Sequence, residues 1–368
     1  MSDERPPWTD SERFDPNVLS RNEQYWRDRQ KWLQERGYML RPRFRPEWVP
    51  SWKTTNKSPI DCEDSNMLWY SHLMDATRIS DGALVGLKRV YKSIHPHEVE
   101  ISMFLLSDEL KSDPRNHTAP IYEVLQVPDD EDAVLIVMPF FRKYDSPRFD
   151  TVGEVIACIR QILQGLQFMH EHLVAHRDCN SRNIMLDPRQ MYPQSFHPAD
   201  PDSKRDYNGF AKYYTRTQRP PRYYFIDFGI SRRYRPEDMP PSEEIIRGGD
   251  KTAPEFNNPS GVANPFPTDV YFIGNMLRED LLRDKYGFDF LSPLVADMVR
   301  ADPSKRPTID EVISRFEQSV KQLSSWKLRS RVVDRDEHPV VGLYRSVGHW
   351  TRRIRFILTR VPPIPMPA

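Results

Sequence analysis

The alternation of apolar and polar residues divides the chain into a strand-rich part and a helix-rich part. Trp69–Ile79 and Ala83–Tyr91 alternate as strands do, and an Asp-Gly pair typical of a tight hairpin lies between them. Two more apolar runs, Ile121–Val127 and Ala133–Met138, predict strands on either side of an acidic turn. The intervening stretch Pro96–Lys111 has an early proline and glutamates, as helices do where they begin. We therefore expect a small antiparallel sheet accompanied by one helix.

From Pro139 onward the pattern becomes mainly helical. Apolar residues recur at helical spacing through residues 152–172, and short strands are expected at 183–186 and 223–226. The segment 187–222 between those strands is polar, rich in proline, tyrosine and basic residues, and too long for an ordinary connection. We interpret it as an insertion that forms a docking or mobile loop on the surface.

Both ends of the chain differ from this body. Residues 1–58 mix charges, aromatics and prolines, with one amphipathic helix expected over 22–36. Phe44, Trp48 and Trp52 recur every four residues, which favours a strap packed across a domain over a ligand site. Residues 323–368 form a basic tail, for which we expect a solvated or docking segment rather than a peripheral membrane contact.

Composition narrows the class of protein. The chain has 368 residues, enough for two lobes, and its 53 Lys plus Arg balance its 53 Asp plus Glu. No overall field therefore points to nucleic acid, and we expect no nucleic-acid partner. Three scattered cysteines fit reduced thiols, and residues 1–10 lack an apolar signal core. We expect an intracellular, cytoplasmic protein.

The clearest chemical signal is the stretch 176–183, which reads HRDCNSRN and follows the predicted long helix. Asp178 and Asn183 lie five positions apart on a loop. That spacing lets one residue receive a proton from an attacking hydroxyl while the other ligates a metal on a transferred phosphate. A lysine, Lys88, lies in a predicted strand upstream, and Asp227 opens an Asp-Phe-Gly sequence at the end of a strand downstream. Together these residues predict phosphoryl transfer.

With these motifs in this order, the chain resembles a eukaryotic-type protein kinase over about residues 60–322. It resembles most closely the divergent kinase-like proteins of basidiomycete fungi, which carry a similar tryptophan-rich leader. The resemblance implies an α+β, two-lobed fold. A small antiparallel β-sheet lobe with one helix would span 59–138, and a larger, mainly helical lobe would span 139–322, between the extension 1–58 and the tail 323–368.

The resemblance also implies roles for the motif residues. Asp178 would be the base that orients the acceptor hydroxyl, while Asn183 and Asp227 would hold Mg²⁺ against the phosphates of ATP. Lys88 would grip the α- and β-phosphates. Its ion-pair partner would be Glu100, with Glu98 as the alternative.

Further matches concern the nucleotide pocket and the activation segment. Met138 would guard the rear of the adenine pocket, and Pro139 to Phe141, with Phe140 between them, would form the hinge. Ala253-Pro254-Glu255 matches the end of an activation segment, and Arg306 its buried salt-bridge partner. Asp269 resembles the aspartate that braces the catalytic loop.

Two departures from the family pattern concern activity and acceptor. No glycine-rich phosphate loop is visible, because residues 61–65 read DCEDS where that loop is expected. Asn180 stands where Ser/Thr kinases usually have a lysine, whereas Arg182 matches the tyrosine-kinase arrangement. The choice between Ser/Thr and Tyr acceptors stays open. We interpret the chain as an ATP- and Mg²⁺-dependent protein kinase; the alternative is a pseudokinase that acts as a binding or scaffolding module.

Overall fold

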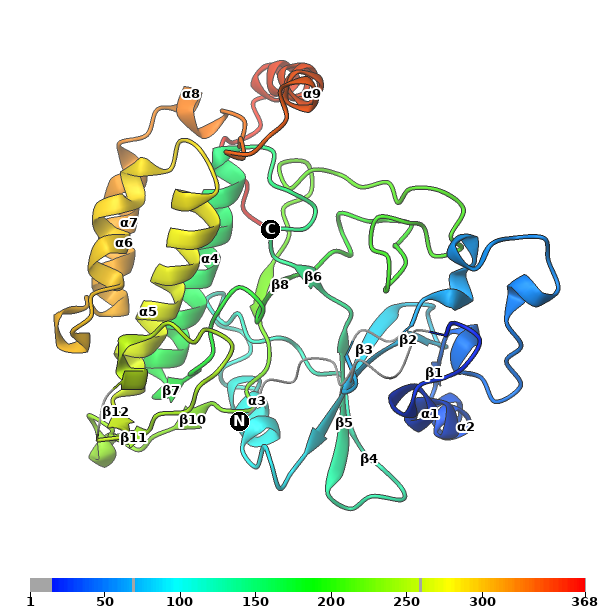
Figure 1. The fold of residues 1–368 in the computed structure, drawn as a ribbon. Helices are drawn as coiled ribbons and strands as arrows, with labels where there is room; N and C mark the ends of the chain where they lie inside the picture. The colour runs from blue at the N-terminus through cyan, green and yellow to red at the C-terminus, as the bar shows by residue number, and fades with distance from the viewer. Residues whose placement is uncertain (1–14, 68–69, 258–259, 368) are drawn as a thin grey trace.

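The computed structural model describes residues 15–67, 70–257 and 260–367, and it has a mixed α+β architecture. The sheet strands lie on one side of the molecule with the N-terminal helices, and the long helices α4 to α7 stand together on the other side (Figure 1). Each side has its own buried apolar cluster. The α+β class expected from the sequence is confirmed, and this arrangement is compatible with two lobes.

The main sheet has, among the described residues, five antiparallel strands in the order β1-β2-β3-β5-β4. Their bounds are β1 Tyr38–Met39, β2 Leu73–Arg78, β3 Leu84–Tyr91, β4 Glu123–Gln126 and β5 Ala133–Pro139. The predicted β2–β3 hairpin forms, and Gly82 takes the positive φ of 72° that its turn requires. Trp69, the predicted start of the first strand, lies outside the described residues. In this register Lys88 sits in the centre of the sheet, between Leu73 and Ile136.

The leader completes this sheet. It contains α1 (Arg21–Asp28), α2 (Gln30–Glu35) and β1, which pairs with β2. The predicted single helix over 22–36 is interrupted at Arg29, whose guanidinium folds back over the Tyr25 ring at 3.8 Å. Trp26, Leu33 and Phe44 are fully buried in the same cluster as residues of β2, β3 and β5. The predicted boundary at residue 58 therefore separates segments that share one core.

A buried ion pair holds the leader in shape. Arg43 Nε donates to Glu23 Oε1 at 2.8 Å, and neither side chain has any solvent exposure. The remaining Arg43 donors reach the backbone carbonyl oxygens of Pro16, Val18 and Asp64. A buried guanidinium is tolerated only when its charge is paired and its donors are used, and both conditions hold here.

The helical side is organised around α4 (Val152–Glu171), which is buried along most of its length. Its first turn is closed by a capping box between Thr151 and Glu154. The helix α7 (Ile309–Lys321) packs against α4, and α6 (Ser292–Met298) packs against both α7 and α5 (Pro265–Leu277). The helix of the sheet side, α3 (Glu98–Leu105), is shorter than predicted, because residues 106–113 form turns closed by short-range backbone hydrogen bonds. Short strands complete this side: β6 Arg142–Lys143, β7 Val174–Ala175, β8 Ile184–Leu186, β9 Tyr223–Phe225, β10 Arg232–Arg233, β11 Glu243–Glu244 and β12 Val262–Ala263.

The insertion 187–222 runs between the two sides, as the green loops of Figure 1 show. Its residues Met191, Tyr192 and Phe196 are buried in the helical core. Farther along, Arg205 donates to the carbonyl oxygen of Gly82 at 3.0 Å and to Thr77 Oγ1 at 2.5 Å, both in the β2–β3 hairpin. The insertion is thus packed against both sides of the molecule rather than projecting from it as the sequence suggested.

The basic tail contains helices that the sequence analysis did not identify. They are the short α8 (Ser325–Leu328) and the long α9 (Pro339–Leu358), which lies at the edge of the molecule in Figure 1. Over the described ranges, no helix is both long and apolar enough to cross a bilayer.

Candidate functional site

The loop 176–183 lies between β7 and β8 and is held from below by one carboxylate. Asp269 of α5, which is fully buried, accepts the backbone N–H groups of His176 at 2.8 Å and Arg177 at 2.7 Å. Arg177 takes a positive φ of 67°, a strained conformation for a residue with a side chain. Asp269 compensates by accepting both hydrogen bonds, so the loop has a defined backbone geometry.

The Asp178 carboxylate is half-buried and hydrogen-bonded on both oxygens. Its Oδ1 accepts Asn180 Nδ2 at 2.6 Å and the backbone N–H of Gly249 at 2.7 Å, while its Oδ2 accepts Asn183 Nδ2 at 2.8 Å. An ionised carboxylate offers about four lone-pair sites, so Oδ2 keeps one for a further donor. Burial raises the pKa of Asp178 despite the opposing hydrogen bond from Gly249. The group is placed to accept a hydrogen bond from a hydroxyl.

Lys88 joins the sheet side of the site to the helical side. Its Nζ lies 2.9 Å from Asp227 Oδ1 and also contacts Glu98 Oε1 directly. Burial alone would lower the pKa of Lys88, but the charges of Asp227 and Glu98 outweigh it and raise that pKa. The lysine therefore stays protonated between two carboxylates from distant parts of the chain.

The prediction that Glu100 pairs with Lys88 is wrong. Glu98 fills that place with its side chain 2% exposed, whereas Glu100 is 69% exposed and lies 3.4 Å from His97. Residues two apart on a helix point in nearly opposite directions, so only one of the two glutamates can face the sheet. Ile101, three positions after Glu98 and buried, marks the inward face of α3.

Asp227 and Asn183 are the candidate metal ligands. The Asp227 side chain is 41% exposed although Lys88 holds one oxygen, so the carboxylate is accessible to an ion. Its φ of 66° is a second strained position in the site, and the Lys88 charge, opposing burial, lowers its pKa. Asn183 donates through Nδ2 to Asp178, and this leaves the side-chain amide oxygen Oδ1 of Asn183 to act as a ligand.

This donor set suits Mg²⁺ rather than a tightly coordinated metal. The described part of the chain contains no cluster of three or more His, Cys, Asp or Glu residues that could hold an ion by themselves. Mg²⁺ is commonly bound by one or two protein oxygens together with waters and substrate phosphates. Asp227 and Asn183 fit that mode, which requires a phosphate ligand to complete the site.

The predicted adenine-pocket residues divide into two groups. Met138 and Phe140 meet Leu73 around Gly86, where a Cβ atom would have all three side chains within 4.0 Å. Gly86 lies two residues before Lys88 in β3, so this apolar spot adjoins the lysine. The Phe141 ring instead packs against Tyr224 with ring centroids 5.4 Å apart. The structure thus places Met138 and Phe140 at the same spot beside Gly86, whereas the Phe141 side chain packs on Tyr224.

The segment predicted to cover the phosphates is built differently from a short loop. The connection from β1 to β2 runs from Leu40 to His72 and contains several helical turns. Within it, Glu63 lies 2.8 Å from His197 of the insertion, and Asp64 accepts hydrogen bonds from Ser51 and Trp48. Two of the three carboxylates in 61–65 are therefore engaged in structure. Residues 68 and 69 lie outside the described residues.

The segment after Asp227 closes over the loop from the other side. Arg182 contacts the Gly249 carbonyl oxygen, so this predicted catalytic residue lies beside the segment. A Cβ atom on Gly248 would overlap Asp178 Oδ1, which means that only glycine fits there without rearrangement. The sequence analysis missed this Gly-Gly pair, although two adjacent glycines in a chain with 14 in total were a visible signal.

The end of this segment is fixed by a second buried ion pair. Glu255 accepts from Arg306 Nη1 at 2.5 Å and from Nη2 at 2.8 Å, and the Glu255 and Arg306 side chains are 3% and 0% exposed. Arg306 also donates to the Pro267 and Arg300 carbonyl oxygens. The structure brings together the two residues that the sequence motifs had paired.

Comparisons with known proteins give a distant similarity. No protein family model matches the chain. The chain is 24% identical to Ephrin type-A receptor 5 from Gallus gallus over 250 aligned residues, which cover 58% of this chain. It spans about a fifth of the length of that relative, since the match covers 21% of it.

Proposed function

We propose that this chain is a protein kinase that uses ATP and Mg²⁺ to phosphorylate a protein hydroxyl. The observation that carries the proposal is the juxtaposition of Lys88, which bridges Glu98 and Asp227, with the Asp178–Asn183 pair. The backbone N–H of Ile226, the residue before Asp227, donates to the Asn183 backbone carbonyl oxygen at 3.0 Å and holds the two groups together. One site then contains a cation for phosphate (Lys88), two oxygen ligands for a metal (on Asn183 and Asp227) and a base for a hydroxyl (Asp178). The distant similarity to Ephrin type-A receptor 5 supports a kinase-like fold.

Each residue has a task that its environment favours. Lys88 is kept protonated by two carboxylates and offers its charge to the phosphates. Asp178 uses its remaining Oδ2 site to orient the acceptor hydroxyl and take its proton. Asn183 and Asp227 would hold Mg²⁺, which when bound neutralises charge on the transferred phosphate. Met138 and Phe140 provide the apolar surface beside Lys88 on which a purine would pack.

The protein acceptor is supported by the segment that ends at Glu255. The buried Arg306–Glu255 pair anchors a surface next to Asp178, where an extended substrate segment could lie. Arg182 beside this surface is the arrangement that resembles tyrosine kinases, and it favours a tyrosine acceptor over serine or threonine.

A second function, a pseudokinase that binds partners without transfer, is favoured by one specific feature. The connection from Leu40 to His72 replaces a glycine-rich loop with turns held by side-chain contacts. Backbone N–H groups that would close over phosphates are less available in such a segment. This reading predicts nucleotide binding that is weak or absent, with the fold intact.

One experiment separates the two functions. The full chain is incubated with radiolabelled ATP and Mg²⁺, and phosphate transfer to itself or to a poly-Glu-Tyr copolymer is measured. Asp178→Asn keeps the shape of the side chain and should reduce transfer by at least about 1,000-fold, while the exposed control Asp238→Ala should leave it unchanged.

The thermal shift with Mg²⁺ and ATP supplies the second measurement. If Mg²⁺ and ATP raise the Tm but no phosphate transfer sensitive to Asp178→Asn is measured, the chain is the binding module. The absence of both transfer and any nucleotide-dependent shift would overturn the kinase proposal.

A further inference from the structure

The helix α9 exposes an apolar stripe along its whole length. Apolar side chains with 46–82% of their surface exposed recur at three- and four-residue spacing. They are Val340, Leu343, Tyr344, Val347, Trp350, Ile354, Ile357 and Leu358. At 100° per residue these positions lie on one side of the helix, so they form a continuous apolar row.

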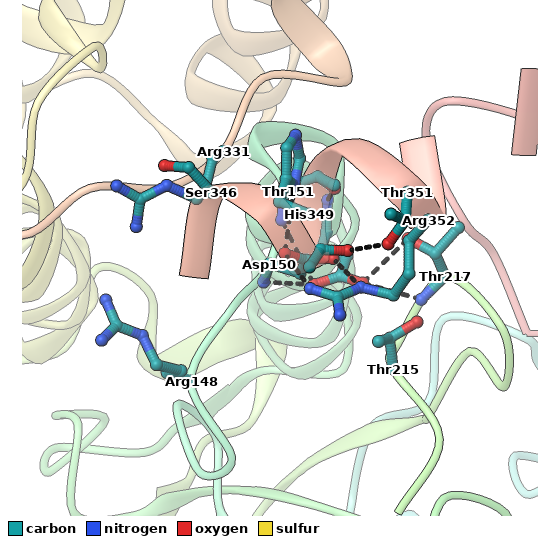
Figure 2. A network of polar contacts seen from close by, with 12 residues as sticks. Arg148, Asp150, Thr151, Thr215, Thr217, Arg331, Ser346, His349, Thr351 and Arg352 are labelled. Atoms are coloured by element: carbon teal, nitrogen blue, oxygen red, sulfur yellow. Dashed lines mark hydrogen bonds and ion pairs between the residues drawn. The ribbon is translucent and has the colours of Figure 1, made fainter. Parts of the chain in front are cut away.

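The opposite face of α9 is attached firmly to the body, so the stripe is held outward. Asp150 accepts from His349 Nδ1 at 3.1 Å and from Arg352 Nε at 2.9 Å, as Figure 2 shows. Burial would raise the pKa of Asp150, but the hydrogen bonds from His349 and Arg352 lower it to about 2. Phe356 is 6% exposed, and the Arg353 guanidinium lies 3.7 Å from the Trp326 ring centroid.

The charge of this region selects the partner. From Pro339 to the end of the chain there is no Asp, Glu or Lys, whereas Arg345, Arg352, Arg353, Arg355 and Arg360 are all present. A second copy of α9 would bring the same positive charge without an acid to match it. Arg352 and Arg353 face the body, but Arg355 and Arg360 are exposed, so an anionic surface matches these two arginines and an apolar interior matches the stripe beside them.

A cavity at the edge of the stripe adds to the same chemistry. Its volume is about 560 Å³, and it is lined by Tyr344 and Val347 of the stripe together with Arg148, Arg331 and Arg345. Arg148, Arg331 and Arg345 share the carboxylate of Glu337, and Arg148 also reaches a second acid, Asp334. Together with Arg216 and Arg352, five arginines line this cavity, and the nearby carboxylates are those of Glu337, Asp334, Asp150 and Glu154. The guanidinium groups outnumber the carboxylates by one, which leaves a small excess of positive charge next to the apolar edge.

We propose that α9 binds the surface of a bilayer containing anionic phospholipids. The helix lies in the plane of the interface, the apolar stripe enters the acyl boundary, and the exposed Arg355 and Arg360 contact headgroups. The tail would then hold the rest of the molecule beside a membrane. The sequence alone favoured a solvated or docking segment, and the exposure of the stripe changes that interpretation.

The test is co-sedimentation of the full chain with vesicles of two compositions. Vesicles of about three parts phosphatidylcholine to one part phosphatidylserine should bind the protein, and pure phosphatidylcholine should bind it at least about tenfold more weakly. The double variant Val347→Asp, Ile354→Asp changes exposed side chains only and should weaken binding by at least about 100-fold. Phe210→Asp, at an 82% exposed site in the insertion, is the matched control and should bind normally.

A charge variant and a hydrodynamic measurement complete the test. Arg355→Glu with Arg360→Glu should reduce binding to the anionic vesicles about tenfold or more, and raised salt should do the same. Equal binding to both vesicle types, or none to either, would overturn the proposal. So would concentration-dependent dimerisation in sedimentation velocity that Val347→Asp, Ile354→Asp abolishes, because the stripe would then be an interface between copies.

Discussion

Asp178 and Lys88 lie on opposite sides of the candidate site, and the chain supports them in different ways. Asp178 belongs to a short loop whose other members, Asn180 and Asn183, bond its carboxylate directly. Lys88 lies in a sheet that is completed by the distant leader, and its charge is balanced by Glu98 and Asp227. On the loop side the groups around Asp178 come mostly from the loop itself, with Asp269 and Gly249 as distant supports, whereas the sheet side is assembled from segments far apart in the sequence.

The difference shows how each side can vary. A local loop keeps its chemistry only if its few residues are retained at the same spacing. A sheet can exchange the segment that completes it, provided that the new segment buries enough apolar surface and pairs its charges. Here the leader does so with Trp26, Leu33 and the Arg43–Glu23 pair.

Removing the buried glutamate of the leader should give the largest effect. Glu23→Ala leaves the Arg43 guanidinium buried without its counter-charge and should lower the free energy of unfolding by about 3–5 kcal/mol. Glu255→Ala, which breaks the buried pair of the helical side, should cost a similar amount. Urea unfolding followed by tryptophan fluorescence measures both. The control Glu35→Ala, exposed on α2, should change the stability by less than about 0.5 kcal/mol. A comparably small cost for Glu23→Ala would mean that the sheet side does not depend on the leader.

Mild acid should weaken the molecule through one buried histidine. Burial lowers the pKa of His117 to about 4, and its Nδ1 lies 2.7 Å from the Tyr223 carbonyl oxygen on the helical side. Because the folded pKa is below the unfolded value of about 6.5, the unfolded chain binds the proton first, and stability falls as the pH drops below about 6.5. The loss should be about 2 kcal/mol between about pH 7 and about pH 5.

Urea unfolding at both pH values tests this dependence against His117→Gln. The variant lacks the titrating group, so its stability should change by less over the same interval, whatever its stability at neutral pH. An equal pH dependence in both proteins would exclude His117 as the source.

The two glutamates of α3 offer a matched pair on the sheet side. Glu98→Gln removes a carboxylate that touches Lys88 and should reduce phosphate transfer about 100-fold, because the lysine loses its position beside Asp227. Glu100→Gln alters an exposed side chain on the same helix, and its rate of transfer should stay within about twofold of the rate of the unmodified chain. Initial rates with ATP and Mg²⁺, together with the nucleotide-induced shift in Tm, measure both variants. A larger loss of transfer in Glu100→Gln than in Glu98→Gln would restore Glu100 as the partner of Lys88, as the sequence predicted.

Two glycines on opposite sides of the site should respond differently to one added methyl group. Gly248→Ala would place a Cβ atom onto Asp178 Oδ1 and should lower the free energy of unfolding by about 1–3 kcal/mol. Gly86→Ala meets Met138, Leu73 and Phe140 only at ordinary contact distances of 3.7–4.0 Å and should be nearly neutral. Thermal unfolding distinguishes the two variants. Equal tolerance would show that the segment at Gly248 can withdraw from Asp178 at little cost.

The sequence by itself determined several local elements of this protein and the proximity of residues within the loop 176–183. The β2–β3 hairpin follows from strand alternation and an Asp-Gly turn, and α4 follows from helical spacing, since these signals lie within a few residues. The predicted proximity of Asp178 and Asn183 required only their spacing on one loop, and the pairing of Glu255 with Arg306 was inferred from two separate motifs.

Tertiary structure decided the features that depend on direction and on distant partners. Whether Glu98 or Glu100 meets Lys88 depends on where α3 begins and how it lies on the sheet, because a shift of two residues turns the helix face away. The pairing of β1 with β2 and the burial of Arg43 arise from segments that no local pattern connects. The apolar spacing of α9 was present in the sequence, but only packing determined which of its faces the protein leaves exposed.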